Sequence, residues 1–164
     1  MAKARPIPGL SAEEPYAAAA AKIVAVRARE VADHSQGVLD VSDVESLHDM
    51  RVATRRLRAA LEVFEPCFPS HEFKSALAEV KAIAGALGER RDRDVTIAAL
   101  DDFSEGLAGP DRPGVSSLIE RLRGEQAEAN AVLEPFVRSE GLAALSERLS
   151  ELVMEAETLA ASEA

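Results

Sequence analysis

Apolar residues recur at helical spacing along most of the chain, and the segment 48–64 shows the pattern most clearly. At about 100° per residue, its apolar and cationic positions fall on opposite sides of one helix. The apolar side comprises Met50, Ala53, Leu57, Leu61 and Phe64. The opposite side comprises His48, Arg51, Arg55 and Arg58. The segment therefore predicts a helix with a buried stripe and, facing away from it, a row of positive charge.

The same period, read with cap and breaker residues, predicts five to six helices joined by short links. The expected ranges are about 12–34, 43–65, 71–87, 92–103, 115–135 and 141–159. No run of alternating residues between turn signals predicts a strand. We therefore expect an all-α fold, an antiparallel helical bundle. Residues 1–10 are expected to form a flexible N-terminal tail, and residues 11–164 a single helical domain.

Local signals set the expected ends of these helices. Ser11 with Glu14, and Ser42 with Glu45, have the spacing of capping boxes. Gly88 is expected to close the third helix as its C-cap. Asp92 is expected to cap a fourth helix, with Asp94 in its first turn. Arg90 and Arg91 would then lie in the connecting turn.

Composition agrees with a helical interior and indicates the compartment. The chain is 47% apolar but only 4% aromatic, so the core must consist mainly of Leu, Val and Ala. Cys67 is the single cysteine, which excludes an intrachain disulfide and is typical of a reducing compartment. The apolar run 17–26 is interrupted by Lys22 and fits neither a signal peptide nor a membrane span. We expect a soluble, cytoplasmic protein.

The charge is distributed unevenly. A net charge of −10 argues at first against a polyanionic partner. However, residues 48–94 hold nine Lys/Arg and eight Asp/Glu, whereas residues 95–164 hold five and fourteen. Residues 51–58 contain four arginines and no acid. An acidic chain has therefore kept its arginines together, which favours an anion site.

Guanidinium groups bind phosphate through paired, charge-assisted hydrogen bonds, and lysines add mobile point charges. Arg51, Arg55 and Arg56 have no acid four residues later, whereas Arg58 has Glu62. The candidate contacts come from consecutive helices and the turn between them, which antiparallel packing would bring to one surface. They are His48, Arg51, Arg55, Arg56, Arg58, Lys74, Lys81, Arg90, Arg91 and Arg93. A solvated or partner-facing helix is the alternative interpretation of the same pattern.

Other chemistry is not indicated. His48 is open to interpretation as a base, a metal ligand or an anion contact, but no Ser-His-Asp pattern or metal-type spacing includes it. Asp92 and Asp94 resemble a metal-binding pair, although capping and orienting arginine is the preferred interpretation. There is no Gly-rich phosphate loop, no double-stranded nucleic-acid motif and almost no aromatic residue for stacking on bases. We expect no catalytic residue, no metal, no cofactor, no specific nucleic acid and no membrane partner.

Two linked motifs resemble the CHAD domain, the conserved histidine α-helical domain. The first is His48-x-x-Arg51-Val52-x-x-Arg55-Arg56-Leu57-Arg58, followed by Phe64 and Lys81. The second is Leu87-Gly88-x-x-Arg91-Asp92-x-Asp94-Val95. The likeness is close over about residues 40–100, where it corresponds to the N-terminal half of the family, and the flanking helices match in character only.

The resemblance implies an all-helical fold that binds inorganic polyphosphate, often at polyphosphate granules or beside a triphosphate-tunnel domain. The resemblance implies that the candidate residues other than Lys74, Arg90 and Arg93 contact the ligand. Those three are added from the expected geometry of the helices. CHAD domains typically contain a second half with its own basic helix, but residues 100–164 hold no such motif. A weakened half-domain and a homodimer that completes the two-fold cavity are both compatible, and the dimer is slightly favoured.

Three hypotheses follow. The leading one is a non-catalytic, cytoplasmic polyphosphate-binding domain, with association with polyphosphate granules as a further expectation. The runner-up is a helical module whose basic face docks an acidic protein. The third, an enzyme that hydrolyses or transfers phosphate, lacks acid/base and metal geometry in the sequence.

Overall fold

Five α-helices make up most of the computed structural model, which describes residues 3–163. They are α1 (Tyr16–Asp33), α2 (Val44–Val63), α3 (His71–Glu105), α4 (Arg112–Val137) and α5 (Ser139–Glu163). Short 3-10 turns at Glu65–Cys67 and Gly109–Asp111 lie in the links on either side of α3. The described part of the chain contains no strand. The predicted all-α fold of five to six helices is confirmed.

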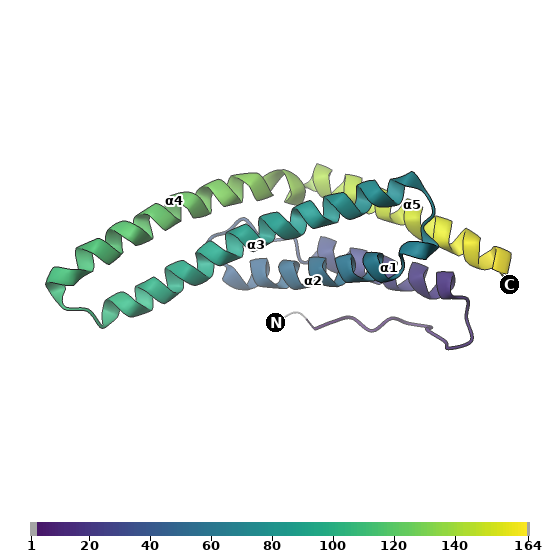
Figure 1. The fold of residues 1–164 in the computed structure, drawn as a ribbon, viewed down its shortest axis with the longest axis horizontal. Helices are drawn as coiled ribbons and strands as arrows, with labels where there is room; N and C mark the ends of the chain where they lie inside the picture. Colours follow the sequence, from purple (N-terminus) through teal and green to yellow (C-terminus); the bar gives the residue numbers. More distant parts are fainter. Residues whose placement is uncertain (1–2, 164) are drawn as a thin grey trace.

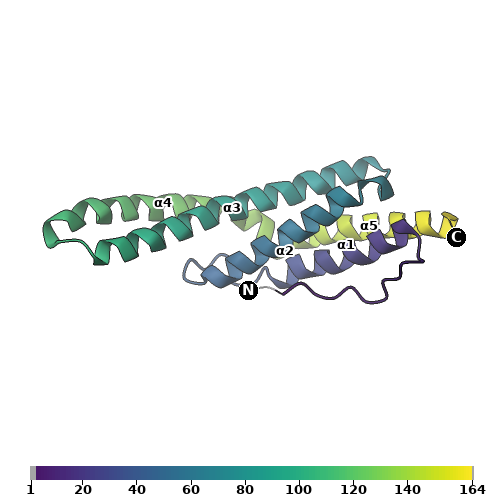
Figure 2. The same cartoon turned by 60° about the horizontal axis from the view of Figure 1, so that its bottom comes forward.

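The helices form a bundle with a projecting arm (Figure 1). α1, α2, α5 and the first part of α3 run antiparallel to their neighbours around one core. α3 then continues past the ends of α1 and α2, and α4 returns along it as a two-helix hairpin. Figure 2 shows α2 lying between α1 and α3, so that its outer face stays open to solvent.

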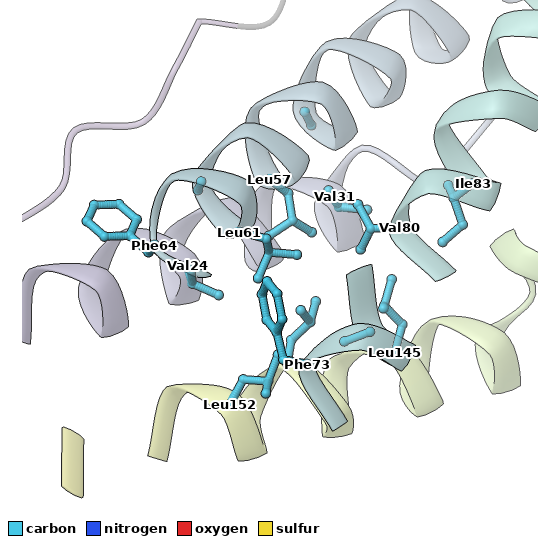
Figure 3. Packing of buried hydrophobic residues seen from close by; sticks show 14 of the residues in the cluster. Val24, Val31, Leu57, Leu61, Phe64, Phe73, Val80, Ile83, Leu145 and Leu152 are labelled. Carbon is cyan, nitrogen blue, oxygen red and sulfur yellow. The ribbon is translucent and has the colours of Figure 1, made fainter. Parts of the chain in front are cut away.

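The core lies where the four helices of the bundle meet. Leu61 of α2, Phe73 of α3 and Leu152 of α5 point toward one another, with Val24 of α1 beside them (Figure 3). All four side chains are buried, and each such burial contributes roughly 1.5–3 kcal/mol. The side of α1 in the core is largely alanine, which lets α1 and α5 pack closely. This packing fixes which face of α2 is turned outward.

Two helix starts differ from the sequence predictions. α2 is capped by Asp43, whose carboxylate accepts a hydrogen bond from the Ser46 backbone N–H at 3.0 Å, and not by Ser42. The Ser11–Glu14 contact forms, with the Ser11 N–H donating to Glu14 at 2.9 Å. It does not start a helix, however, because α1 begins at Tyr16 with Pro15 as its N-cap residue. Residues 3–15 form no helix or strand, and they contact α1 where the Arg5 N–H donates to Glu30 at 2.6 Å.

The largest correction concerns α3. The sequence predicted a break at Gly88 and a new helix from Asp92, but α3 is one helix of 35 residues. Gly88 has helical neighbours on both sides, so it is not a C-cap, and Asp92 and Asp94 cap nothing. The reason is that burial continues across the glycine, and this packing outweighs the weak helix propensity of glycine. The buried positions of this half are Ile83, Ala86, Leu87, Arg90, Asp94 and Ile97.

A buried polar network holds α3 to α4 and to the loop before α2. Arg90 is fully buried, and its Nε donates to Asp94 Oδ1 at 2.9 Å. The same Asp94 oxygen accepts from the Gln126 amide of α4 at 2.6 Å. Arg90 also donates to the Asn130 side chain at 2.5 Å, and Asn130 donates to the Leu39 carbonyl at 2.8 Å. Hydrogen bonds of this kind offset part of the cost of burying a charge pair, although Arg90 Nη2 and Asp94 Oδ2 have no partner among the described residues.

α4 and α5 form a rod with one break. Pro135 lies inside α4, where it lacks the N–H that a helix interior requires, and α4 ends two residues later. α5 then begins at Ser139, with Gly141 packed closely against the Pro135 carbonyl. A Cβ at position 141 would lie 2.3 Å from that oxygen, so only glycine fits without a shift of the backbone. The predicted end of the helix at Pro135 was therefore nearly correct.

The continuity of α3 predicts the effect of Gly88→Ala. Because a Cβ at this position meets nothing within 4 Å, alanine should raise the free energy of unfolding by about 0.5–1 kcal/mol through its better helix propensity. Urea denaturation measures this change. Gly37→Ala is the contrasting variant. Gly37 has φ +78°, a conformation that strains an alanine, so this substitution should lower the free energy of unfolding. A loss of stability in Gly88→Ala would mean that the helix ends at Gly88.

The polar network predicts a large difference between two neighbouring aspartates. Asp94→Ala leaves Arg90 as an uncompensated buried charge and should lower the free energy of unfolding by about 3–5 kcal/mol. Asp92→Ala removes an exposed carboxylate two residues away and should change it by less than about 0.5 kcal/mol. Chemical denaturation monitored by circular dichroism compares the two. Equal losses would contradict the role assigned to the buried pair.

Candidate anion-binding surface

The outer face of α2 carries the cationic row that its periodicity predicts. The residues buried on the other side are Leu47, Met50, Ala53, Thr54, Leu57, Ala60 and Leu61. Because these positions fix the rotation of the helix, His48 and Arg51 lie half-buried on the outer side, and Arg55 and Arg58 are exposed there. The apolar stripe thus determines which way the cationic side of the helix faces.

Most of these cations are not neutralised by the protein. Within residues 3–163, His48, Arg51 and Arg55 make no hydrogen bond or ion pair to another side chain or to the backbone. The same holds for Lys74 and Arg91 of α3. Guanidinium donors that the fold leaves unused are available to an external anion.

The α3 side of this surface is joined to α2 through Glu62. The Glu62 carboxylate accepts from Arg58 Nε at 3.0 Å, and Lys81 Nζ lies 3.2 Å from the same oxygen. The hydrogen bonds from Arg58 and then Lys81 hold the pKa of Glu62 below its usual range. Lys81 of α3 and Arg58 of α2 are therefore neighbours on one surface.

Helical spacing places two further α3 cations relative to this pair. Lys74 is seven residues before Lys81 and shares its flank, and it is exposed. Arg91 is about 200° around the helix from both Glu89 and Arg93, which face α4. Arg91 therefore lies on the opposite flank of α3, the one nearer to α2. We call His48, Arg51, Arg55, Arg58, Lys74, Lys81 and Arg91 the basic surface.

Arg56 lies on the other flank of α2, toward α1. Its charge acts on Glu30, a buried carboxylate of α1. Burial alone would raise the pKa of Glu30, but hydrogen bonds from Arg5 and Arg27 and the charges of Arg27 and Arg56 lower it overall. Of the predicted α2 cations, Arg56 is the one that balances an internal acid of the fold.

Arg90 and Arg93 do not lie on the basic surface. Their prediction as contacts assumed that the helix breaks after Gly88, with Arg90 in the turn and Arg93 in a new helix, but α3 has no break there. In a continuous helix, Arg90 falls on the core side and is fully buried against Asp94. Arg93 pairs with Glu89 one turn earlier on α3, and its Nε lies 3.6 Å from a carboxylate oxygen of Glu125 on α4. Asp94 does orient an arginine, as the sequence suggested, but that arginine is Arg90 in the interior.

The remaining chemical candidates do not form a cluster. Among the described residues, no group of three or more His, Cys, Asp or Glu side chains is placed to hold a metal ion. Asp92 is exposed and Asp94 is buried, so the two do not face one site. Within residues 3–163, no helix has the length and apolar character required to cross a bilayer.

Comparison with protein families supports the resemblance given by the motifs. The family model of the CHAD domain matches residues 22–164. The chain belongs to the CHAD-domain family. The match of this CHAD domain extends well beyond residues 40–100, so it includes the helices that were expected to agree only in character. Comparisons with curated proteins and with solved structures found no match.

Sequence reasoning did not find the cross-helix role of Glu62. Its spacing from Arg58 was visible, but the approach of Lys81 depends on how α2 and α3 pack in three dimensions. The burial of Arg90 was missed for a related reason, because a glycine that precedes a charged run is a common end of a helix. Continuing the apolar period of α3 through Leu87 would have shown that positions 90 and 94 fall on the core side of the CHAD domain.

The contact at Glu62 predicts its titration. In the CHAD domain the side-chain carboxyl of Glu62 should titrate below the ordinary glutamate pKa of about 4.3, since both hydrogen bonds favour the ionised form. Carbon-detected NMR of the carboxyl group measures the midpoint. Lys81→Ala should raise this midpoint toward the ordinary value but not fully to it, because the hydrogen bond from Arg58 remains. An ordinary midpoint in the unmodified protein would show that the contact does not persist in solution.

Proposed function

We propose that this CHAD domain binds inorganic polyphosphate, without catalysis, along the basic surface. The observation that carries the proposal is the set of unpaired cations on α2 and α3, in a chain whose net charge is −10. Holding Arg51 and Arg55 so close together without an acid partner costs electrostatic repulsion. An anion of high charge density offsets that repulsion, and membership of the CHAD family, which is associated with polyphosphate, indicates which anion.

The form of the surface also suits a chain better than a small molecule. The cations follow the length of two adjacent helices and do not surround one enclosed cavity. A linear polyphosphate presents acceptor oxygens and negative charge at every unit, so successive units meet successive cations. Arginines supply paired hydrogen bonds and lysines supply point charges.

A second copy of the chain would supply a second basic helix, and we include this homodimer in the proposal. In Figure 1 the α3–α4 arm extends past the ends of α1 and α2. It carries large apolar side chains exposed to solvent, among them Val95, Phe103 and Val132. Burial of these side chains against another copy would remove apolar surface from water. Cytoplasmic localisation and association with granules stay predictions.

Calorimetric titration of long-chain polyphosphate tests the proposal. Binding should be measurable at low salt and weaken steeply as salt rises, because bound counterions are released. Arg51→Ala combined with Arg55→Ala removes two charge-assisted contacts and should lower the affinity by at least about tenfold. The control is Arg121→Ala with Arg123→Ala, which removes the same charge from exposed, paired arginines on α4.

Two results would reject the proposal. One is no binding at low salt, and the other is an equal loss of affinity in both double variants. If the protein instead retained an acidic polypeptide that polyphosphate did not displace, the basic surface would be a docking site for an acidic protein. Size-exclusion chromatography with light scattering, with and without polyphosphate, tests the homodimer separately.

A further inference from the structure

Glu62 lies within the basic surface, where it contacts a cation of α2 and a cation of α3. Both Arg58 and Lys81 contact the same oxygen, Oε1 of Glu62, at 3.0 and 3.2 Å. The three side chains are 45%, 44% and 40% exposed, respectively, so solvent and ligands reach them. By contrast, Arg51 and Arg55 on the same helix have no acid partner in the described chain. The surface therefore contains free cations beside a pair that is already engaged.

An anion that occupies the whole surface must replace Glu62 at this pair. Exposed ion pairs contribute little, so the exchange is open to a strong competitor. A phosphate unit brings more charge and more acceptor oxygens than a carboxylate. A carboxylate from an acidic peptide offers the same group that Glu62 already provides, and Glu62 has the advantage of being attached to the same chain. The exchange therefore favours phosphate over carboxylate ligands.

We propose that Glu62 is a specificity-determining residue, an internal carboxylate that competes with anionic ligands for Arg58 and Lys81. This inference rests on the proposed function and adds a reason for selectivity to it. A long phosphate chain gains both the free arginines and, by displacing Glu62, the engaged pair. Acidic polypeptides gain the free arginines alone. Glu62 thus lowers the affinity for every anion, but lowers it most for carboxylate ligands.

Glu62→Gln tests the inference, because it keeps the size and an acceptor oxygen of the side chain while removing its charge. Affinity for long-chain polyphosphate at low salt should rise about two- to fivefold, the range that corresponds to one exposed ion pair. Affinity for poly-glutamate should rise by a larger factor, so the ratio of the two affinities should fall. The slope of log affinity against log salt concentration should become steeper by about one, because one more cation is available to the ligand.

The matched control is Glu134→Gln. Glu134 is also the acid of an i,i+4 pair with an arginine, Arg138 at 2.6 Å, but it lies on α4 away from the basic surface. It changes the net charge by the same amount as Glu62→Gln but frees no cation of the basic surface, so it should leave both affinities and their ratio unchanged. Melting temperatures of the two variants should match that of the unmodified protein, which shows that the fold is intact.

A double-mutant cycle with Lys81→Met separates competition from positioning. If Glu62 competes, loss of Lys81 should cost more affinity in the Glu62→Gln background, where Lys81 is fully available. If Glu62 instead positions Lys81 for the ligand, Glu62→Gln should weaken binding, and that result would overturn the inference. Equal polyphosphate affinity in Glu62→Gln and unmodified protein would also overturn it while leaving the proposed function in place. No polyphosphate binding by the unmodified protein would reject both.

Discussion

The buried pair of Arg90 and Asp94 is the constraint on which the rest of the fold depends. A charged pair inside a helical interior needs hydrogen-bond partners, and those that Arg90 and Asp94 have come from α4 and from the loop before α2. Its hydrogen bonds hold α4 along α3 and tie both helices to the loop at Val38 and Leu39.

Much of the fold followed from the sequence because the apolar period is regular and most breaks are marked. Most helices, the break between α3 and α4 and the outward row on α2 are local properties that periodicity and cap residues determine, although α4 begins at Arg112, about three residues earlier than expected. The join at Gly88 was not predictable from local signals, because glycine and two aspartates favour a cap while tertiary burial favours continuation. Packing against α4 decided the outcome.

The candidate surface likewise has a part that local sequence signals predict and a part that depends on tertiary packing. His48, Arg51, Arg55 and Arg58 share one helix, so their common face was visible in the spacing alone. The grouping of Lys81 with Arg58 around Glu62 needs the packed pair of helices. Arg91 belongs to the surface and Arg90 to the interior, although they are adjacent in the chain. Only the rotation of an unbroken helix separates them.

The continuity of α3 also gives the surface a fixed scale. Because one rigid helix carries Lys74, Lys81 and Arg91, their backbone positions follow the helical rise of 1.5 Å per residue, which gives intervals of about 10 Å and 15 Å. A hinge at Gly88 would have made the second interval variable. As one continuous helix, α3 holds these three cations at fixed axial spacings, whether or not a ligand is bound.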